Sequence, residues 1–377
     1  MSSEQELFHA LELAHYANRF RDKIFVVGLP AETPFQDLLL DLKVLTGYRI
    51  QVALVLHDPT FSLERLIGVS NKRGTRFHLS LLTELLVGPG GERPKLDFER
   101  IRGVLSAGRT PIIAFQGELP APADIDRTYT LAGEVALLLG AAKLFLVSPM
   151  VTPLLETLPR SHVLSGEMEE WSAKLASRGL HDHQPLFAFI RKFLGRGVPD
   201  IILIEGKRTN LFREVFTHDG AGILFNQVAT AVIRQARTED ITDIALLLEP
   251  DIEARRILPV SEDDIEANIA GYWVYEVDGV LVGTAGLKRF GNWAEMAHFS
   301  TLPRYRGKGR AKDLALRLVE EARFLKLEKV FALSIDQRMW DFFLDLEFAE
   351  VDRNNLPAAW RAGYDLARPS RAFLRKL

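Results

Sequence analysis

Two different patterns of apolar and polar positions follow each other along the chain. Up to about Phe225, short apolar runs such as QVALVL, TPIIAFQ, KLFLVS and DIILIEG alternate with helical stretches such as TPFQDLLLDLKVL and LAGEVALLLGA. Strands that alternate with helices predict βαβ units and a parallel sheet covered on both faces. Residues 4–20 carry apolar side chains at helical spacing and predict an amphipathic helix before the first strand.

The pattern changes after Phe225. IRQARTEDITDIALLLEP predicts a helix with Thr238 as its N-cap. WVYEVDGVLVGTAGLKRF predicts a hairpin that turns at Asp278 and Gly279, and WAEMAHFSTL predicts a third strand. A helix over residues 311–326 and the strand KVFALSI follow. We expect FNQVATAV to link this second region to the first.

The length of the chain agrees with two regions. At 377 residues it is longer than one hydrophobic core usually serves. The sequence therefore predicts one domain at residues 1–225 and a second at residues 231–377.

Composition narrows the classes of protein to consider. Lys and Arg number 47 against 50 Asp and Glu, so the chain has no net attraction for nucleic acid or anionic membranes. The absence of cysteine excludes disulfides, thiolate nucleophiles and cysteine-based zinc sites, and the nine histidines show no HExxH-like spacing. The amino terminus is unlike a signal peptide, and no apolar run approaches the roughly 18 residues that span a bilayer. We expect a soluble cytoplasmic protein without a metal site.

The segment RYRGKGRA at residues 304–311 concentrates positive charge where a strand gives way to a helix. A glycine-rich turn that opens a helix offers backbone N–H groups at the positive end of the helix dipole, an arrangement that binds phosphate. Gly307 and Gly309 let the backbone approach a ligand closely. Four cations add positive charge around it: Arg304, Arg306, Lys308 and Arg310. On the turn alone, a solvated basic cap of a helix remains an equal alternative, and neither a Walker A loop nor GxGxxG is present.

This turn resembles the [RQ]-x-x-G-x-[GA] turn of the GNAT superfamily of acetyl-CoA-dependent acyltransferases. The resemblance implies that backbone N–H groups of the turn bind the pyrophosphate of the co-substrate acetyl-CoA. It also implies that the preceding strand, including Phe299 and Thr301, lies along the pantetheine. The turn comprises Arg306, Gly307, Lys308, Gly309, Arg310 and Ala311.

A longer resemblance extends to the N-acetylglutamate synthases that have an amino-acid-kinase-like first domain. It is carried by IRQARTEDITDI, WAEMAHFSTLPRYRGKGRA, FALSI with EFAEVDRNNLP, and YDLARPSRAFLRKL. The resemblance implies a three-layer αβα sandwich followed by a GNAT α/β domain. It implies transfer of acetyl to the α-amino group of L-glutamate, the first step of arginine biosynthesis, by direct attack of the amine.

The same resemblance assigns roles to five residues. Glu295 stands where the family has the carboxylate that takes a proton from the substrate ammonium, and Ser334 where it has a hydroxyl near the departing thiolate. Arg368 and Ser370 match a terminal R-x-S that holds a glutamate carboxylate, and His298 matches a position whose backbone carbonyl contacts the amino group. Without the family, Glu295 reads as one partner of a surface ion pair, Ser334 as a small polar strand residue and Arg368 as part of a charged tail.

One difference from the family leaves the identity of the acetyl acceptor open. Relatives often carry an Arg as a further carboxylate ligand where this chain has Val260 in ILPVSEDD. Arg255 or Arg256 could substitute from a neighbouring turn. An acetyltransferase for another amine, and a non-catalytic sensor of arginine or CoA, are therefore the alternatives to an N-acetylglutamate synthase.

The first region resembles N-acetylglutamate kinase in LAGEVALLLGAAKLFLVSP and FREVFTHDGAG, but it lacks the catalytic groups. GLPA at residues 28–31 replaces K-x-G-G, and LHDP at residues 56–59 replaces the second glycine loop. Tyr129 and Pro149 stand where kinases have aspartates. Phosphoryl transfer depends on positioned charge and metal, so we predict no kinase activity.

Regulation is a further implication of the resemblance. In arginine-sensitive relatives the amino-terminal helix and the segment before GxG bind arginine, and the helix joins dimers into a hexamer. Four residues match those segments: Tyr16, Glu214, Gly220 and Gly222. Ile202 stands where relatives have a His. The alternatives are thus an L-arginine effector site or a helix and sheet retained for homo-oligomer formation alone, and we expect a homo-oligomer in either case.

Overall fold

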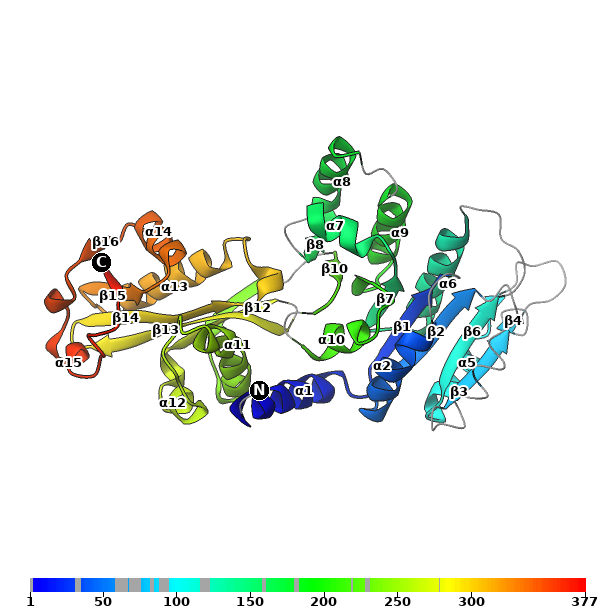
Figure 1. Cartoon of the computed structure of the whole chain (residues 1–377), viewed down its shortest axis with the longest axis horizontal. Helices are drawn as coiled ribbons and strands as arrows, with labels where there is room; N and C mark the ends of the chain where they lie inside the picture. Colours follow the sequence, from blue (N-terminus) through cyan, green and yellow to red (C-terminus); the bar gives the residue numbers. More distant parts are fainter. Residues whose placement is uncertain are drawn as a thin grey trace. The chain divides into compact units, whose positions relative to one another are not determined.

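The computed structural model divides the chain into two compact units, Met1–Val228 and Ala229–Leu377 (Figure 1). Strand β10 ends at Asn226 and β11 begins at Ala231, so the predicted linker FNQVATAV is wrong at both ends, where its residues belong to strands. The kinase-loop positions 31, 58 and 59, and Asp278 of the predicted hairpin, lie outside the described residues. The structure describes residues 3–30, 35–57, 67, 76–81, 85–87, 95–115, 123–157, 161–179, 183–217, 220–227, 231–277 and 279–377.

The first unit is built on an eight-stranded sheet with the order β3-β6-β2-β1-β7-β9-β10-β8. All neighbouring strands are parallel except β9 and β10, which run antiparallel. A two-stranded ribbon, β4 (Leu86–Val87) and β5 (Lys95–Leu96), is separate from this sheet. The sheet strands are β1 (Ile24–Leu29), β2 (Gln51–His57), β3 (Phe77–Leu81), β6 (Thr110–Phe115), β7 (Lys143–Val147), β8 (His162–Leu164), β9 (Asp200–Ile204) and β10 (Ile223–Asn226).

Helices cover both faces of this sheet because successive strand residues point to opposite sides. Val26 of β1 belongs to one apolar core, whereas its neighbours Phe25 and Val27 belong to the other. The Val26 side is covered by α5 (Phe98–Ser106), α6 (Ala123–Leu139), α7 (Val151–Thr157), α8 (Met168–Ser177) and α9 (His183–Gly195). The other side is covered by α1 (Ser3–Phe20), α2 (Phe35–Gly47) and α10 (Asn210–Phe216). The predicted three-layer αβα sandwich is confirmed.

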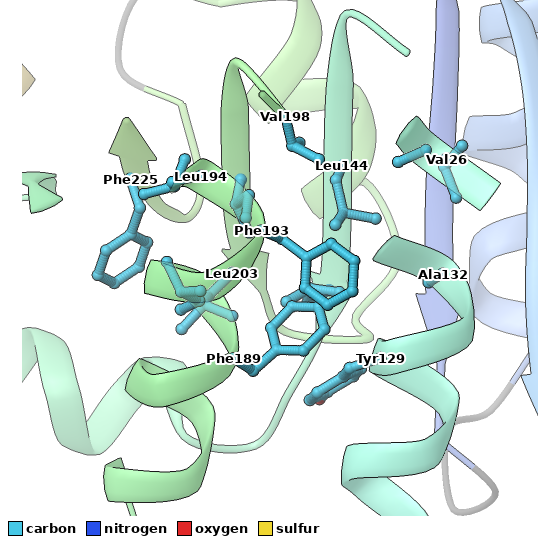
Figure 2. Close-up of a cluster of buried hydrophobic side chains, with 14 of the residues drawn as sticks. Val26, Tyr129, Ala132, Leu144, Phe189, Phe193, Leu194, Val198, Leu203 and Phe225 are labelled. Atoms are coloured by element: carbon cyan, nitrogen blue, oxygen red, sulfur yellow. The ribbon is translucent and has the colours of Figure 1, made fainter. Parts of the chain in front are cut away.

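Figure 2 shows how closely α6 and α9 approach each other in this core. Phe189 and Phe193 of α9 lie against the α6 residues Tyr129 and Ala132. A Cβ atom at Gly133 would lie 2.5 Å from the Phe193 ring, so a glycine is required there. Tyr129, which stands where kinases have an aspartate, is buried and donates a hydrogen bond of 2.6 Å to the carbonyl oxygen of Val147. The position therefore contributes to the core.

The second unit is built on a seven-stranded sheet with the order β11-β12-β13-β14-β15-β17-β16. Its neighbours are antiparallel except β14 and β15, which are parallel. Helices α13 and α14 pack on one face, and α11 and α12 on the other. The strands are β11 (Ala231–Gln235), β12 (Tyr272–Val277), β13 (Val280–Phe290), β14 (Trp293–Thr301), β15 (Lys329–Ser334), β16 (Ala349–Val351) and β17 (Arg371–Lys376). The α-helices are α11 (Ile241–Glu253), α12 (Glu262–Ala267), α13 (Arg310–Phe324), α14 (Gln337–Asp345) and α15 (Ala358–Arg361).

The predicted elements of this unit are present, but the start of its first helix is different. A 3-10 turn, Thr238–Asp240, precedes α11, so Thr238 is not the N-cap. The Asp240 carboxylate instead accepts the Arg237 N–H at 2.8 Å and forms an ion pair with Arg234. An acidic side chain within the 3-10 turn thus accepts a backbone N–H group at the start of this helix. In the described part of the chain, no helix is long and apolar enough to span a bilayer.

Candidate active site

The pairing between β14 and β15 ends at Glu295. These parallel strands pair only over Trp293–Lys329, Ala294–Val330 and Glu295–Phe331, although each continues beyond that point. On the other edge of β14, a bulge places His298 and Phe299 opposite a single β13 residue. A bulge bends its strand, and His298 has a left-handed φ of 57° at the bend. The β14 backbone beyond Glu295 therefore has no ladder partner in β15.

Glu295 lies at the last paired position of these strands. Burial raises the pKa of its carboxyl group, while the indole of Trp360 and the ammonium of Lys288 act in the opposite direction. Lys288 is its partner on β13, and Trp360 belongs to α15, where its ring packs edge-on against Phe331 of β15. A carboxylate with a raised pKa is a stronger base than one in water, so Glu295 is suited to accept a proton.

His298 follows three residues later and is bound to Tyr272 of β12. The Tyr272 hydroxyl lies 2.7 Å from Nδ1 of His298, and the two rings are nearly parallel. Burial, assisted by the charge of Lys288, lowers the pKa of His298 to about 4. Burial also raises the pKa of Tyr272. Both side chains are consequently neutral at physiological pH, and Tyr272 fixes the ring at the bulge.

The glycine turn connects the end of β14 to α13. Gly307 and Gly309 have φ values of 75° and 77°, and Gly309 is the N-cap residue of the helix. The Arg306 side chain donates a 2.8 Å hydrogen bond from Nε to the carbonyl oxygen of Thr301, the last residue of β14. The N–H groups of the first turn of α13 point out of this end of the helix. The Arg306 side chain thus connects the end of β14 to the turn that precedes α13.

Arg310 takes part in this turn differently from the prediction that its charge faces a ligand. Its side chain is 6% exposed and donates from Nη1 to the carbonyl oxygen of Tyr305 at 2.8 Å. The guanidinium also lies over the rings of Tyr305 and Tyr275. The Arg310 side chain therefore stabilises the turn through its bond to Tyr305, and its backbone is the first residue of α13. Phe299 and Thr301 of β14 are the two residues predicted to lie along the pantetheine. Phe299 packs edge-on against Phe342 and Phe343, and Thr301 is buried.

Ser334 ends β15, three residues after Phe331, the last β15 residue that pairs with β14. Its hydroxyl accepts the Asp336 N–H at 3.0 Å, and its carbonyl oxygen accepts a hydrogen bond from the Trp340 indole at 2.8 Å. Asp336 caps α14 by accepting the N–H of Arg338. The start of α14 thereby fixes the half-buried Ser334 where β14 and β15 no longer pair.

Arg368 is held by the turn between α11 and α12. Its Nη2 donates to the carbonyl oxygens of Arg255 and Arg256 at 3.0 and 2.8 Å. Within the described residues, its Nε and Nη1 make no hydrogen bond. The guanidinium is therefore oriented through one nitrogen while two donors stay available for a carboxylate.

Ser370 lies beside Arg368 but is bound by its own chain. Its hydroxyl is buried and accepts hydrogen bonds from Tyr364 at 2.9 Å and Arg353 at 3.4 Å. Arg353 also donates to the carbonyl oxygen of Arg368 at 2.6 Å. Sequence reasoning missed Arg353, Tyr364 and Tyr272, because no spacing signal links these distant segments.

The predicted regulatory residues lie in the first unit. Glu214 of α10 accepts the N–H groups of Ala221 and Gly222 at 2.7 and 2.9 Å. Gly220 has a φ of 64°, and a Cβ at Gly222 would lie 2.2 Å from the Leu203 carbonyl oxygen. The structure thus brings Glu214, Gly220 and Gly222 together at one turn.

Tyr16 lies on α1, which packs against α10. Its ring stacks on Phe20 and contacts the apolar core on that face of the sheet. Among the described residues, no group of three or more His, Asp or Glu side chains could hold a metal ion.

A family comparison matches the second unit. Residues 237–348 match the model of the acetyltransferase (GNAT) family, and this range includes the turn, the bulge, Glu295 and Ser334. The second unit has the GNAT fold. The ends of the GNAT unit that carry Arg234, Arg353 and Arg368 lie outside the matched range.

Curated relatives agree with this match. The chain is 30% identical over 185 residues to an amino-acid acetyltransferase of Neisseria meningitidis, a match that covers 48% of this chain and 42% of the relative. It is 31% identical over 183 residues to an amino-acid acetyltransferase of Aliivibrio fischeri, covering 48% of this chain and 41% of the relative. The chain thus spans less than half the length of the curated relatives it matches.

A solved structure resembles both units. N-acetylglutamate synthase from Neisseria gonorrhoeae, complexed with coenzyme A and L-arginine, matches with a TM-score of 0.59 and 21% identity over 98% of this chain and 99% of that one. At this identity the likeness shows the fold. The predicted order, an αβα sandwich followed by a GNAT domain, is confirmed.

Proposed function

We propose that the chain is an N-acetylglutamate synthase, which transfers acetyl from acetyl-CoA to the α-amino group of L-glutamate as the first step of arginine biosynthesis. The observation that carries the proposal is the end of β14–β15 pairing directly after Glu295, on a strand that leads into the glycine turn of α13. The names of the curated relatives and of the structural neighbour support the same reaction.

Acetyl-CoA would bind along β14 and at the glycine turn. Backbone N–H groups of residues 306–311 would bind the pyrophosphate, aided by the dipole of α13. The amides of pantetheine resemble a peptide strand, so they would pair with β14 near Phe299 and Thr301, where no β15 ladder competes. This binding mode places the thioester near Glu295 without a metal.

Acetyl transfer requires a neutral amine. The raised pKa of Glu295 favours removal of a proton from the substrate ammonium, directly or through one water. The amine nitrogen then attacks the acetyl carbonyl carbon, a carbon–nitrogen bond forms, the nitrogen releases its second proton to solvent and the carbon–sulfur bond to CoA breaks. Ser334 would donate a hydrogen bond to the departing thiolate, which takes its proton from solvent. Much of the rate enhancement would come from holding amine and thioester together.

Acceptor selectivity would rest on Arg368. Its Nη2 is bound to two carbonyl oxygens, which leaves Nε and Nη1 for a glutamate carboxylate. Arg256, considered as a replacement for the Arg missing at Val260, forms an ion pair with Asp251. Ser370 would support this site through its bonds to Arg353 and Tyr364.

A panel of amine acceptors with acetyl-CoA tests the proposal. Release of free thiol is measured for glutamate, aspartate, glutamine and a polyamine, and the product is identified by mass spectrometry. Glutamate is expected to give the highest kcat/KM. A higher value for another amine would establish the alternative acetyltransferase, and no turnover with any acceptor despite CoA binding would favour the sensor.

We infer that the first unit binds L-arginine. Support comes from the turn that joins Glu214, Gly220 and Gly222, from α1 packing against α10, and from the arginine bound in the structural neighbour. Calorimetric titration of the full chain with L-arginine tests this, with D-arginine as the control. Binding that Glu214→Gln does not weaken would place the ligand elsewhere, and no binding would leave oligomer formation as the role of this unit.

A further inference from the structure

A buried carboxylate links two parts of the candidate site that are far apart in sequence. Asp251, in the last turn of α11, is 8% exposed. Its Oδ1 accepts a hydrogen bond from Nε of Arg256 at 2.7 Å and lies 2.6 Å from Nη2 of the same guanidinium in an ion pair. Its Oδ2 accepts a hydrogen bond from the Ser300 hydroxyl at 2.8 Å. Both carboxylate oxygens are therefore engaged, by two different segments.

The bond to Ser300 reaches the strand that carries the proposed base. Ser300 is the first β14 residue to pair with β13 again after the bulge at His298 and Phe299. Its hydroxyl also lies 2.7 Å from the carbonyl oxygen of Leu247, one helical turn before Asp251. The end of α11 is thus attached to β14 next to the bulge.

The bond to Arg256 reaches the turn that orients Arg368. The backbone carbonyl oxygen of Asp251 accepts the N–H groups of Arg256 and Ile257 at 2.8 and 3.1 Å, so the same residue closes the turn through backbone and side chain. The carbonyl oxygens of Arg255 and Arg256 in this turn accept both hydrogen bonds from Arg368 Nη2. The direction of the Arg368 guanidinium therefore depends on how Asp251 holds the turn.

The charges around this link favour an anionic ligand. Asp251 is paired with Arg256, and Asp336 with Arg338. The two pairs also act on each other, because the Arg256 charge helps lower the pKa of Asp336. Three arginines around this link form no ion pair in the described residues: Arg255, Arg353 and Arg368. Positive charge is thus left for a carboxylate.

We propose that Asp251 is a positioning residue for the acceptor. It fixes the place of Arg368, which would hold the acceptor carboxylate, relative to the segment of β14 that carries Glu295 and would face the acceptor amine. This inference rests on the proposed function of the site. It assigns Asp251 no contact with either substrate, and it assigns Ser300 the role of attaching Asp251 to the strand.

Kinetics of Asp251→Asn and Ser300→Ala test the proposal, with Glu253→Gln as the matched control. Glu253 lies on the same helix, is exposed and has no partner in the described residues. Asp251→Asn is expected to raise KM for glutamate by about tenfold and change kcat less than about threefold. Ser300→Ala is expected to raise the same KM by about threefold. KM for acetyl-CoA stays unchanged in both variants.

A measurement on the free protein separates this inference from the proposed function. Hydrogen exchange is followed in residues 254–258 and 366–371 of the wild type and the three variants. Asp251→Asn is expected to speed exchange in both segments, whereas Glu253→Gln leaves both as in the wild type. A wild type without glutamate turnover would overturn the proposed function, and the exchange at residues 366–371 would still decide whether Asp251 holds Arg368.

Three results would overturn the inference. The first is an unchanged KM for glutamate in folded Asp251→Asn and Ser300→Ala. The second is a parallel rise of KM for both substrates, which indicates a general loss of structure. The third is unchanged exchange in residues 366–371 of Asp251→Asn.

Discussion

Glu214 in the first unit and Glu295 in the second are both carboxylates that are proposed to act on a ligand, but their surroundings differ. One oxygen of Glu214 accepts two backbone N–H groups of its own chain. Glu295 has the Trp360 indole and the Lys288 ammonium nearby, and burial still raises its pKa. The Glu214 carboxylate holds a turn through backbone donors, whereas the Glu295 carboxyl group, whose pKa is raised by burial, is suited to accept a proton.

The largest expected effect comes from Glu295→Gln, which removes the proposed base without changing its shape. We expect kcat/KM for glutamate to fall by roughly 10²- to 10⁴-fold while calorimetric binding of acetyl-CoA stays intact. Undiminished turnover would assign the base to another group.

The same variant has an opposite effect on stability. Because the folded pKa of Glu295 is raised, its contribution to stability is fully present below the ordinary value of 4.5 and is lost as pH rises through the folded pKa. At pH 7 the ionised group therefore opposes folding, and Gln removes that cost. Urea unfolding at pH 7 should show Glu295→Gln to be at least as stable as the wild type.

Gly222→Ala carries the second largest effect and tests the turn held by Glu214. A Cβ atom there would lie 2.2 Å from a backbone oxygen of β9, which cannot move without disturbing the sheet. We expect a loss of roughly 3 kcal/mol in the free energy of unfolding of the first unit, and weaker arginine binding. Gly195→Ala, where nothing lies within 4 Å of the added atom, is the control. Equal stability of the two variants would show that the turn has room to move.

The sequence predicted the elements that local pattern controls. Apolar runs located the strands, and the glycines and cations of RYRGKGRA located the turn before α13, because a left-handed residue at a helix start favours glycine. Thr238 was a wrong prediction for the N-cap because a 3-10 turn that includes it precedes α11, and the Asp240 carboxylate accepts the Arg237 N–H within that turn. Residue preferences at helix starts do not distinguish which of two nearby polar residues, here Thr238 and Asp240, binds a backbone N–H group.

The parts that escaped prediction depend on segments distant in sequence. No local signal marks the bulge at His298, which follows from the register between β13 and β14. Arg310 was predicted to place its charge around a ligand, but its guanidinium is buried and lies over the rings of Tyr275 and Tyr305. The anchoring of Arg368 on the carbonyls of residues 255 and 256 likewise requires the fold. Residue types were thus predictable, and their partners were not.

The third prediction concerns acid stability and uses His298, whose pKa shift is opposite in sign to that of Glu295. Its pKa falls from 6.5 to about 4 in the folded protein, so its contribution to stability is present above 6.5 and is lost as pH falls through about 4. After a discount for its partial exposure, we expect a loss of about 1–2 kcal/mol over this window. His298→Gln should flatten the dependence of the urea midpoint on pH. An unchanged slope would assign the acid sensitivity to other groups.

The smallest expected effect separates strain from ligand binding at two glycines of the second unit. Gly309 and Gly291 have φ values of 77° and 65°, and nothing lies within 4 Å of a Cβ added at either. Alanine at each should therefore cost about 1 kcal/mol of stability through backbone strain alone. Only Gly309 lies at the start of α13, so only Gly309→Ala should also raise KM for acetyl-CoA, by about fivefold, because the strained turn moves its N–H groups away from the pyrophosphate. An equal KM for acetyl-CoA in Gly309→Ala and Gly291→Ala, with equal losses of stability, would mean that the turn does not bind the coenzyme.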